Sequence, residues 1–220
     1  MNTHFHRPQR PLRAFTLIEM LVVIAIIGIL AALILVAGPA AIRKMRFARV
    51  EGEKEALITI IEKYKARKNF YPPDNTNLDA VVNPLYYELG GAKQLPSGSF
   101  VSLSQQTLAP NTVASLFGRD GFINSSGDPA EVENFLKASL KNSQFAMVSN
   151  GVGTPFTVLG VPIQGPIMLK RVDGTATINP WRYVSSHATN NDGSFDLWMD
   201  ITIGGQVYRI SNWSKDPQPL

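Results

Sequence analysis

Residues 15–42 decide the fold of this chain, and they read FTLIEMLVVIAIIGILAALILVAGPAAI. Glu19 is the only ionisable side chain in this stretch. A helix needs about 20 predominantly apolar residues to cross a bilayer, and this run is longer than that. The sequence therefore predicts a single transmembrane helix over residues 15–42.

The residues before the apolar run indicate its orientation. Residues 1–14 are polar and contain Arg7, Arg10 and Arg13. Because Lys and Arg beside a span favour the cytoplasmic side of the membrane, we expect the N-terminus in the cytoplasm and the chain from Arg43 onward outside the membrane. An ordinary secretory signal peptide is the alternative, since Val36-Ala37-Gly38-Pro39-Ala40 offers small residues for cleavage. The cores of such peptides are usually about 7–15 residues, so the length of the run favours the membrane anchor.

The helical pattern continues beyond the apolar run and becomes amphipathic. Its apolar positions recur at i, i+3, i+4 and i+7, as on one face of a helix; they are Leu57, Ile60, Ile61 and Tyr64. Its charged positions predict a solvent-exposed face; they are Lys54, Glu55, Glu62 and Lys63. With no turn signal between the two segments, one helix is expected from about Phe15 to about Lys68, on the order of 80 Å long.

Two pairs of residues are expected to shape this helix. Gly38 and Pro39 lie inside it, and proline removes a backbone donor and clashes with the preceding turn, so a kink or local melting is predicted there. Pro72 and Pro73 are expected to stop the helix. The chain then divides into a leader over 1–14, a transmembrane and assembly helix over 15–42, the amphipathic half of the same helix over 43–70, and a globular head over 71–220.

The head shows signals for one helix and several strands. Asp128 as N-cap and Pro129 at the first helical position predict a short helix that ends near Leu140. Apolar or alternating runs predict strands at 145–149, 167–172, 175–178, 195–203 and 206–210. Asp173-Gly174 and Gly204-Gly205 separate neighbouring runs and predict tight hairpins. No helix or strand is predicted for the stretch 89–108. The expected fold class is α+β, with the long helix packed on an antiparallel sheet.

The start of the apolar run carries a recognisable motif. Ala14-Phe15-Thr16-Leu17-Ile18-Glu19, followed by the apolar helix, closely resembles the cleavage and methylation signal of type IV prepilins and type II secretion pseudopilins. The resemblance implies that a prepilin peptidase cuts between Ala14 and Phe15 and methylates the new amine of Phe15. The family usually has Gly before the cut, where this chain has Ala14; alanine is the nearest substitute in size, so processing is still expected.

The same resemblance implies a structural role in a filament. Phe15, Thr16 and Glu19 are the expected assembly and register residues, and the partners are prepilin peptidase, other copies of the chain and related pilin subunits, an inner-membrane assembly platform and membrane lipid. The subunit would lie in the inner membrane as a single-pass protein, with its head periplasmic or extracellular, before it joins the filament. The fold expected from the resemblance is pilin-like.

Electrostatics indicates a pairing role for Glu19 within the apolar run. An unpaired carboxylate costs about 2.5–3.5 kcal/mol at mid-bilayer on insertion scales. In a staggered bundle of subunits the amine of Phe15 on one chain can approach Glu19 on another, and such a pair would fix axial register. The alternative is that Glu19 only reaches toward the cytoplasmic headgroups.

The end of the head resembles the C-terminal part of major pseudopilins, on residues 179–183 and 193–198. In that family the loop after the Asp-Leu strand often binds calcium, whereas here residues 199–205 continue a strand into a hairpin. The remaining calcium candidates are Asp192 and Asp196, in a segment without the alternating acids of a known calcium loop. A turn rich in residues that tolerate left-handed backbone is the preferred interpretation, so no cofactor is expected.

Composition and motif searches narrow the function classes. The formal charge is +4, and three of those charges are the leader arginines. The later Lys and Arg residues alternate with Glu51, Glu53, Glu55 and Glu62, which favours a solvated helix face over a nucleic-acid surface. Without cysteine the head must be stabilised by packing or by an ion rather than by disulfides.

No catalytic motif is present in the sequence. Only His187 of the three histidines lies beyond the leader, and there is no nucleophile elbow, phosphate-binding loop or His-Glu-x-x-His signature. The predicted function is therefore a structural subunit of a type II secretion pseudopilus or a type IV pilus-like filament, and not an enzyme. The alternative is an exported binding or enzymatic domain that uses the helix only as an anchor.

Overall fold

The long N-terminal helix is continuous in the computed structural model, which describes residues 16–137, 140–149 and 153–220. Helix α1 spans Leu17–Lys68 and confirms the predicted helix to within two residues at its start. It remains helical through Gly38 and Pro39, and the kink expected there stays a prediction. Asn69, with a φ of 69°, ends the helix and donates its amide to the carbonyl of Lys65 at 2.7 Å. The stop therefore comes before the prolines 72 and 73.

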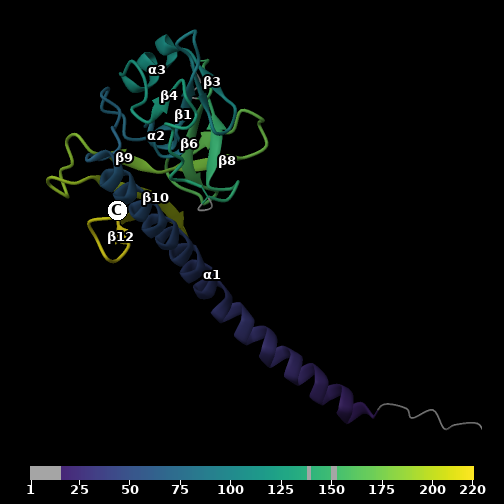
Figure 1. Cartoon of the computed structure of the whole chain (residues 1–220). Helices are drawn as coiled ribbons and strands as arrows, with labels where there is room; N and C mark the ends of the chain where they lie inside the picture. Colours follow the sequence, from purple (N-terminus) through teal and green to yellow (C-terminus); the bar gives the residue numbers. More distant parts are fainter. Residues whose placement is uncertain (1–15, 138–139, 150–152) are drawn as a thin grey trace, which may run out of the picture. The chain divides into compact units, whose positions relative to one another are not determined.

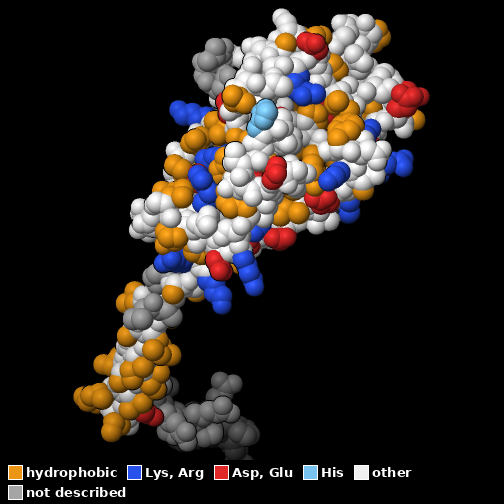
Figure 2. Space-filling model, turned by 90° about the vertical axis from the view of Figure 1, so that its left-hand side faces the viewer, with side chains coloured by type: hydrophobic (Ala, Val, Ile, Leu, Met, Phe, Trp, Pro, Cys, Tyr) orange, Lys and Arg blue, Asp and Glu red, His pale blue; other side chains and the backbone are white. Residues whose placement is uncertain are grey.

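The chain consists of two compact units, Met1–Met45 and Arg46–Leu220. In the first unit every described side chain from Thr16 to Leu35 is exposed. Figure 2 shows apolar side chains covering this part of α1. The second unit contains the rest of α1 together with the head, so the amphipathic half of the helix folds with the head.

The head begins with two short helices and a small sheet (Figure 1). Helix α2 spans Leu85–Gly90 and α3 spans Pro110–Phe117, with proline in its first turn and Gly118 in the left-handed conformation at its end. Strands β1 (Ala92–Gln94), β2 (Phe100–Ser102), β3 (Thr107–Leu108) and β4 (Ser125–Ser126) form a sheet in the order β3-β2-β1-β4. This sheet occupies much of the stretch 89–108 that the sequence left unassigned, and its β1–β4 pair is parallel.

Two further sheets are antiparallel throughout. The middle part of the head forms β5 (Phe145–Val148), β6 (Phe156–Val161), β7 (Leu169–Lys170) and β8 (Thr177–Pro180), in the order β5-β6-β8-β7. The C-terminal part forms β9 (Arg182–Val184), β10 (Asp196–Ile203), β11 (Gln206–Ser211) and β12 (Gln218–Pro219), in the order β12-β11-β10-β9. These pairings confirm the predicted α+β class.

Both predicted hairpins are present. Ile203 pairs with Gln206 across Gly204 and Gly205, whose φ values are 60° and 83°. Two consecutive positive φ values are what a two-residue hairpin turn requires, and glycine adopts them without steric cost. Gly174, with a φ of 70°, likewise turns the chain between β7 and β8, which pair antiparallel.

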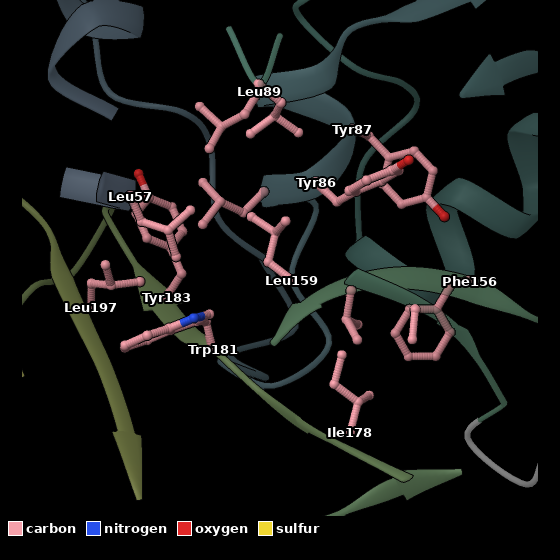
Figure 3. Close-up of a cluster of buried hydrophobic side chains, with 14 of the residues drawn as sticks. Leu57, Tyr86, Tyr87, Leu89, Phe156, Leu159, Ile178, Trp181, Tyr183 and Leu197 are labelled. Carbon is pink, nitrogen blue, oxygen red and sulfur yellow. The ribbon is translucent and has the colours of Figure 1, made fainter. Parts of the chain in front are cut away.

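The core of the second unit joins residues from distant parts of the sequence. Figure 3 shows side chains of α1, α2 and the strands β6, β8, β9 and β10 converging on one cluster; those it labels include Leu57, Tyr87, Phe156, Ile178 and Trp181. Each of these five side chains is buried. The α1 face predicted from periodicity is confirmed, since Leu57, Ile60, Ile61 and Tyr64 are all in this core.

The helix predicted over 128–140 is wrong for residues 128–137 and 140, the part of it that the structure describes. Asp128 does cap one turn, since its carboxylate accepts the amide of Ala130 at 2.9 Å, but the chain then leaves the helical path. The amide of Glu133 donates to the side chain of Asn124 at 3.2 Å, and the amide of Phe135 donates to the carbonyl of Leu89 at 2.9 Å. These tertiary hydrogen bonds replace those that a helix would form, so local capping chemistry is overridden.

Lys54 was predicted on the solvent-exposed face, and that is wrong. Its side chain is 5% exposed and lies on the same helix stripe as Val50 and Leu57, which are buried. The ammonium contacts Glu51 at 2.5 Å and Glu55 at 3.4 Å. Because a long aliphatic stem can pack against apolar neighbours while its charge is paired, a lysine can occupy a position on the buried stripe. Glu55, Glu62 and Lys63 are exposed as predicted.

Candidate functional site

The N-terminus of α1 is closed by a reciprocal pair of hydrogen bonds between Thr16 and Glu19. The backbone amide and the hydroxyl of Thr16 both donate to Oε2 of Glu19 at 2.8 Å. In return the amide of Glu19 donates to the Thr16 hydroxyl at 3.3 Å. This is a capping box, in which the first residue before the helix and the third residue inside it satisfy each other's backbone donors. The one acid of the apolar segment therefore has a partner within its own chain.

The sequence interpretation treated Thr16 and Glu19 as intermolecular residues and missed this pairing. The signal was available, because Thr-x-x-Glu directly before an apolar helical run is the spacing of a capping box. An acid at this place also interacts favourably with the positive end of the helix dipole. The capping bonds use Oε2 of Glu19, and a carboxylate has a second oxygen that can accept from another donor.

The remaining residues of the predicted N-terminal site are placed only in part. Ala14 and Phe15, between which cleavage is predicted, lie outside the described residues. Gly38 lies within α1, and a Cβ added at this glycine would meet no atom within 4 Å. In the part of the chain that the structure describes, α1 is the one helix long and apolar enough to cross a membrane.

The amphipathic half of α1 is fixed to the head through a buried carboxylate. Glu88 of α2 has no exposed surface, and it accepts hydrogen bonds from the hydroxyl of Tyr64 at 2.9 Å and from the amides of Ile123 and Asn124 at 2.9 and 3.1 Å. Burial raises the pKa of Glu88, while these three donors and the charge of Arg119 oppose that rise. The group thus joins α1, α2 and the segment before β4 at one point.

The two calcium candidates, Asp192 and Asp196, differ in exposure and in hydrogen bonding. Asp192 is exposed, whereas Asp196 is 3% exposed and accepts five hydrogen bonds. Its oxygens receive the backbone amides of Thr189, Asn190 and Asn191 at 3.0 Å, and the side-chain amides of Asn190 and Asn191 at 2.9 and 3.2 Å. Calcium requires oxygen ligands with free lone pairs, so N–H groups aimed at both oxygens do not fit a calcium site.

Other candidate groups are also structural or isolated. Trp181 is buried in the core. Trp198 and Trp213 are half-buried and form an edge-to-face pair with ring centroids 5.7 Å apart. His187 is exposed. Among the described residues there is no group of three or more His, Cys, Asp or Glu side chains that could hold a metal ion.

These features together define a pilin-like protein, in which one long helix is apolar and self-capped in its first half and packs into an α+β head with its second half. The comparisons with known proteins agree. The model of the prokaryotic N-terminal methylation motif matches residues 11–35. Type II secretion system core protein G of Pseudomonas aeruginosa is 31% identical over 142 residues, which cover 58% of this chain and 97% of that protein. No solved structure matches the chain.

The chain accordingly belongs to the pseudopilin family of type IV pilin-like proteins. That family is structural rather than enzymatic. An apolar N-terminal helix together with this membership indicates anchoring in the inner membrane.

Proposed function

We propose that this chain is a structural subunit of a secretion pseudopilus or a pilus-like filament, made as a membrane-inserted precursor. Prepilin peptidase removes residues 1–14 and methylates the amine of Phe15. The mature subunit stays in the inner membrane as a single-pass protein, with its head on the far side, until it joins the filament. Type II secretion is the favoured machine, because the relative is named as a core protein of that system.

One observation carries this proposal. The first half of α1 is apolar and exposed along its described length, yet it begins with an acid that is held in place by Thr16. A helix that is apolar on all sides must be covered by lipid or by other chains. In a filament the helices of neighbouring subunits would supply that cover.

Assembly would give Glu19 a second partner, on a neighbouring chain, in addition to Thr16. In the membrane-resident subunit, the Thr16 donors offset part of the cost of placing Glu19 in an apolar environment. In the filament the second oxygen of Glu19 would accept from the amine of Phe15 on a neighbouring chain. An apolar surface slides past its neighbours at little cost, whereas one charge pair in a low dielectric favours a single axial offset.

The direct test of the proposed function is shearing of cells and detection of this chain in the released filaments. We expect the chain in the sheared fraction when the secretion genes are active. Detection only in the inner membrane under those conditions would favour the alternative of a tethered binding or enzymatic domain.

Intact-mass analysis of membrane-extracted protein tests the processing step separately. The expected mass corresponds to a chain that begins at Phe15 and carries one added methyl group. A mature start at Ala41 would contradict the proposal and support a signal peptide. Replacing Ala14 with Gly should leave processing intact, while a bulky residue at this position should block it.

A further inference from the structure

The seven residues that follow the apolar segment hold a concentration of positive charge. Arg43, Lys44, Arg46 and Arg49 fall within this stretch of α1 and are all exposed; we call them the cation belt. No acid lies between Glu19 and Glu51. Arg49 pairs with Glu53 at 3.2 Å, and the acids of the interleaved region begin only beyond the belt. The belt therefore precedes every acid of the mixed region, and Arg49 pairs with one of those acids.

The length of the apolar segment places this belt relative to a bilayer. Residues 17–42 of α1 extend over about 39 Å at 1.5 Å per residue, while the hydrocarbon core of a bilayer is about 30 Å thick. When that segment spans the membrane, the belt lies at the headgroup level on the side opposite Glu19. Long Lys and Arg side chains reach readily into that layer.

The head covers one side of the later part of this stretch, since Phe47 packs edge-to-face on Tyr208 and Val50 is buried. The four cationic side chains are nevertheless exposed. Their charges are therefore accessible to lipid headgroups.

We propose that the cation belt binds the phosphate headgroups of anionic phospholipids in the leaflet that faces the head. Basic residues next to a span gain affinity for anionic lipid with each added charge. Loss of the leader arginines during processing leaves the mature chain with no cationic side chain before the belt. The belt is then the main ionic attachment of the mature subunit to the membrane until assembly. This inference rests on the proposed function in one respect, namely that residues 17–42 span the membrane.

The test uses the full mature chain in proteoliposomes of equimolar phosphatidylglycerol and phosphatidylcholine. After gentle extraction, native mass spectrometry counts the lipids that remain bound. We expect phosphatidylglycerol to be enriched roughly tenfold or more over phosphatidylcholine at low salt, and the enrichment to fall as salt is raised. The belt variant replaces all four cations with Gln, and its enrichment should fall to near unity.

A matched control removes the same charge from the other end of the same helix. It replaces four cations with Gln: Lys63, Lys65, Arg67 and Lys68. Retained enrichment in this control supports the belt as a site. Equal loss in both variants, or enrichment that survives in the belt variant, would overturn the proposal. An outcome in which the belt variant instead loses an acidic protein partner, with lipid binding unchanged, overturns it as well.

Carbonate extraction of native membranes distinguishes failure of the proposed function from failure of the cation belt as a lipid site. A parent chain that is washed from the membrane would contradict the spanning helix and so the proposed function. A parent chain that resists extraction but shows no preference for anionic lipid would contradict only the cation belt as a lipid site.

Discussion

The two halves of α1 share one backbone but depend on different surroundings. The first half is apolar on all sides, and its described side chains are exposed. In the second half one stripe is buried, and Tyr64 bonds to a carboxylate of the head. Helix propagation is local and needs only suitable residues, whereas helix stability comes from whatever covers the apolar face. The second half therefore brings its cover within its own chain, and the first half must obtain it from lipid or from other subunits.

The largest expected effect tests this contrast with two substitutions, one in the head core that covers the second half of α1 and one in the first half of α1. Trp181→Ala should lower the free energy of unfolding of the head by about 3–5 kcal/mol, because it removes a large buried ring from the core. Thermal unfolding of the full chain in detergent, followed by near-ultraviolet circular dichroism, measures the effect. The matched variant in the first half is Leu33→Ala, whose parent side chain is 61% exposed.

Leu33→Ala should leave the thermal unfolding of the head unchanged. A shift in melting temperature comparable with that of Trp181→Ala would mean that the first half of α1 contributes to the stability of the head, and the contrast between the halves would fail.

A smaller effect is expected from the loop that precedes β10. Asp196→Ala leaves five N–H donors without their acceptor, at a cost of about 1–3 kcal/mol. Faster proteolysis within residues 189–195 and a lower melting temperature should follow. Asp192→Ala is the control and should behave as the parent does. Calcium should not raise the melting temperature of the parent; a rise of several degrees would show that the loop binds the ion.

The link between α1 and the head should respond to pH. Burial raises the pKa of Glu88 above its unfolded value, so the folded head binds this proton more tightly than the unfolded chain does. The contribution of Glu88 to stability is then largest below the unfolded pKa and declines as pH rises through the folded pKa. Glu88→Gln should flatten this part of the pH profile of unfolding and should also lower stability, because an amide has one acceptor oxygen for three donors.

Asp216→Asn, at an exposed position near the C-terminus, is the control for Glu88→Gln. Because the side chain of Asp216 is exposed, this variant should unfold at the same denaturant concentration as the parent at neutral pH. A Glu88→Gln variant that keeps the parent's slope would contradict the assignment of the slope to Glu88.

The sequence predicted the parts of this molecule that depend on local chemistry. Apolar composition and periodicity were enough for α1, and the dipeptides Asp173-Gly174 and Gly204-Gly205 were enough for the two hairpins. The unassigned stretch 89–108 failed because β1 to β3 are two or three residues long and are held by pairing rather than by propensity. The predicted strand 167–172 is shorter than expected, with only Leu169 and Lys170 in the ladder.

Tertiary partners account for the remaining errors. Glu133 and Phe135 hydrogen-bond to residues far from the predicted helix, and no local signal reports such partners. The assembly role of Thr16 and Glu19 stays a prediction, and their intramolecular capping box was missed although its spacing is visible in the sequence.

The central claim is that Glu19 does more than cap its own helix. Thr16→Val removes the hydroxyl that pairs with Glu19 while the acid remains, so it should weaken the cap by about 0.5–2 kcal/mol and affect assembly less than loss of the acid does. The most direct measurement is the yield of sheared filaments from Glu19→Ala, compared with the parent at equal amounts of processed subunit in the membrane. We predict insertion and cleavage close to those of the parent and a filament yield lower by about tenfold or more, since a tenfold change corresponds to only about 1.4 kcal/mol. A Glu19→Ala chain that assembles as well as the parent would show that Glu19 acts only within its own subunit.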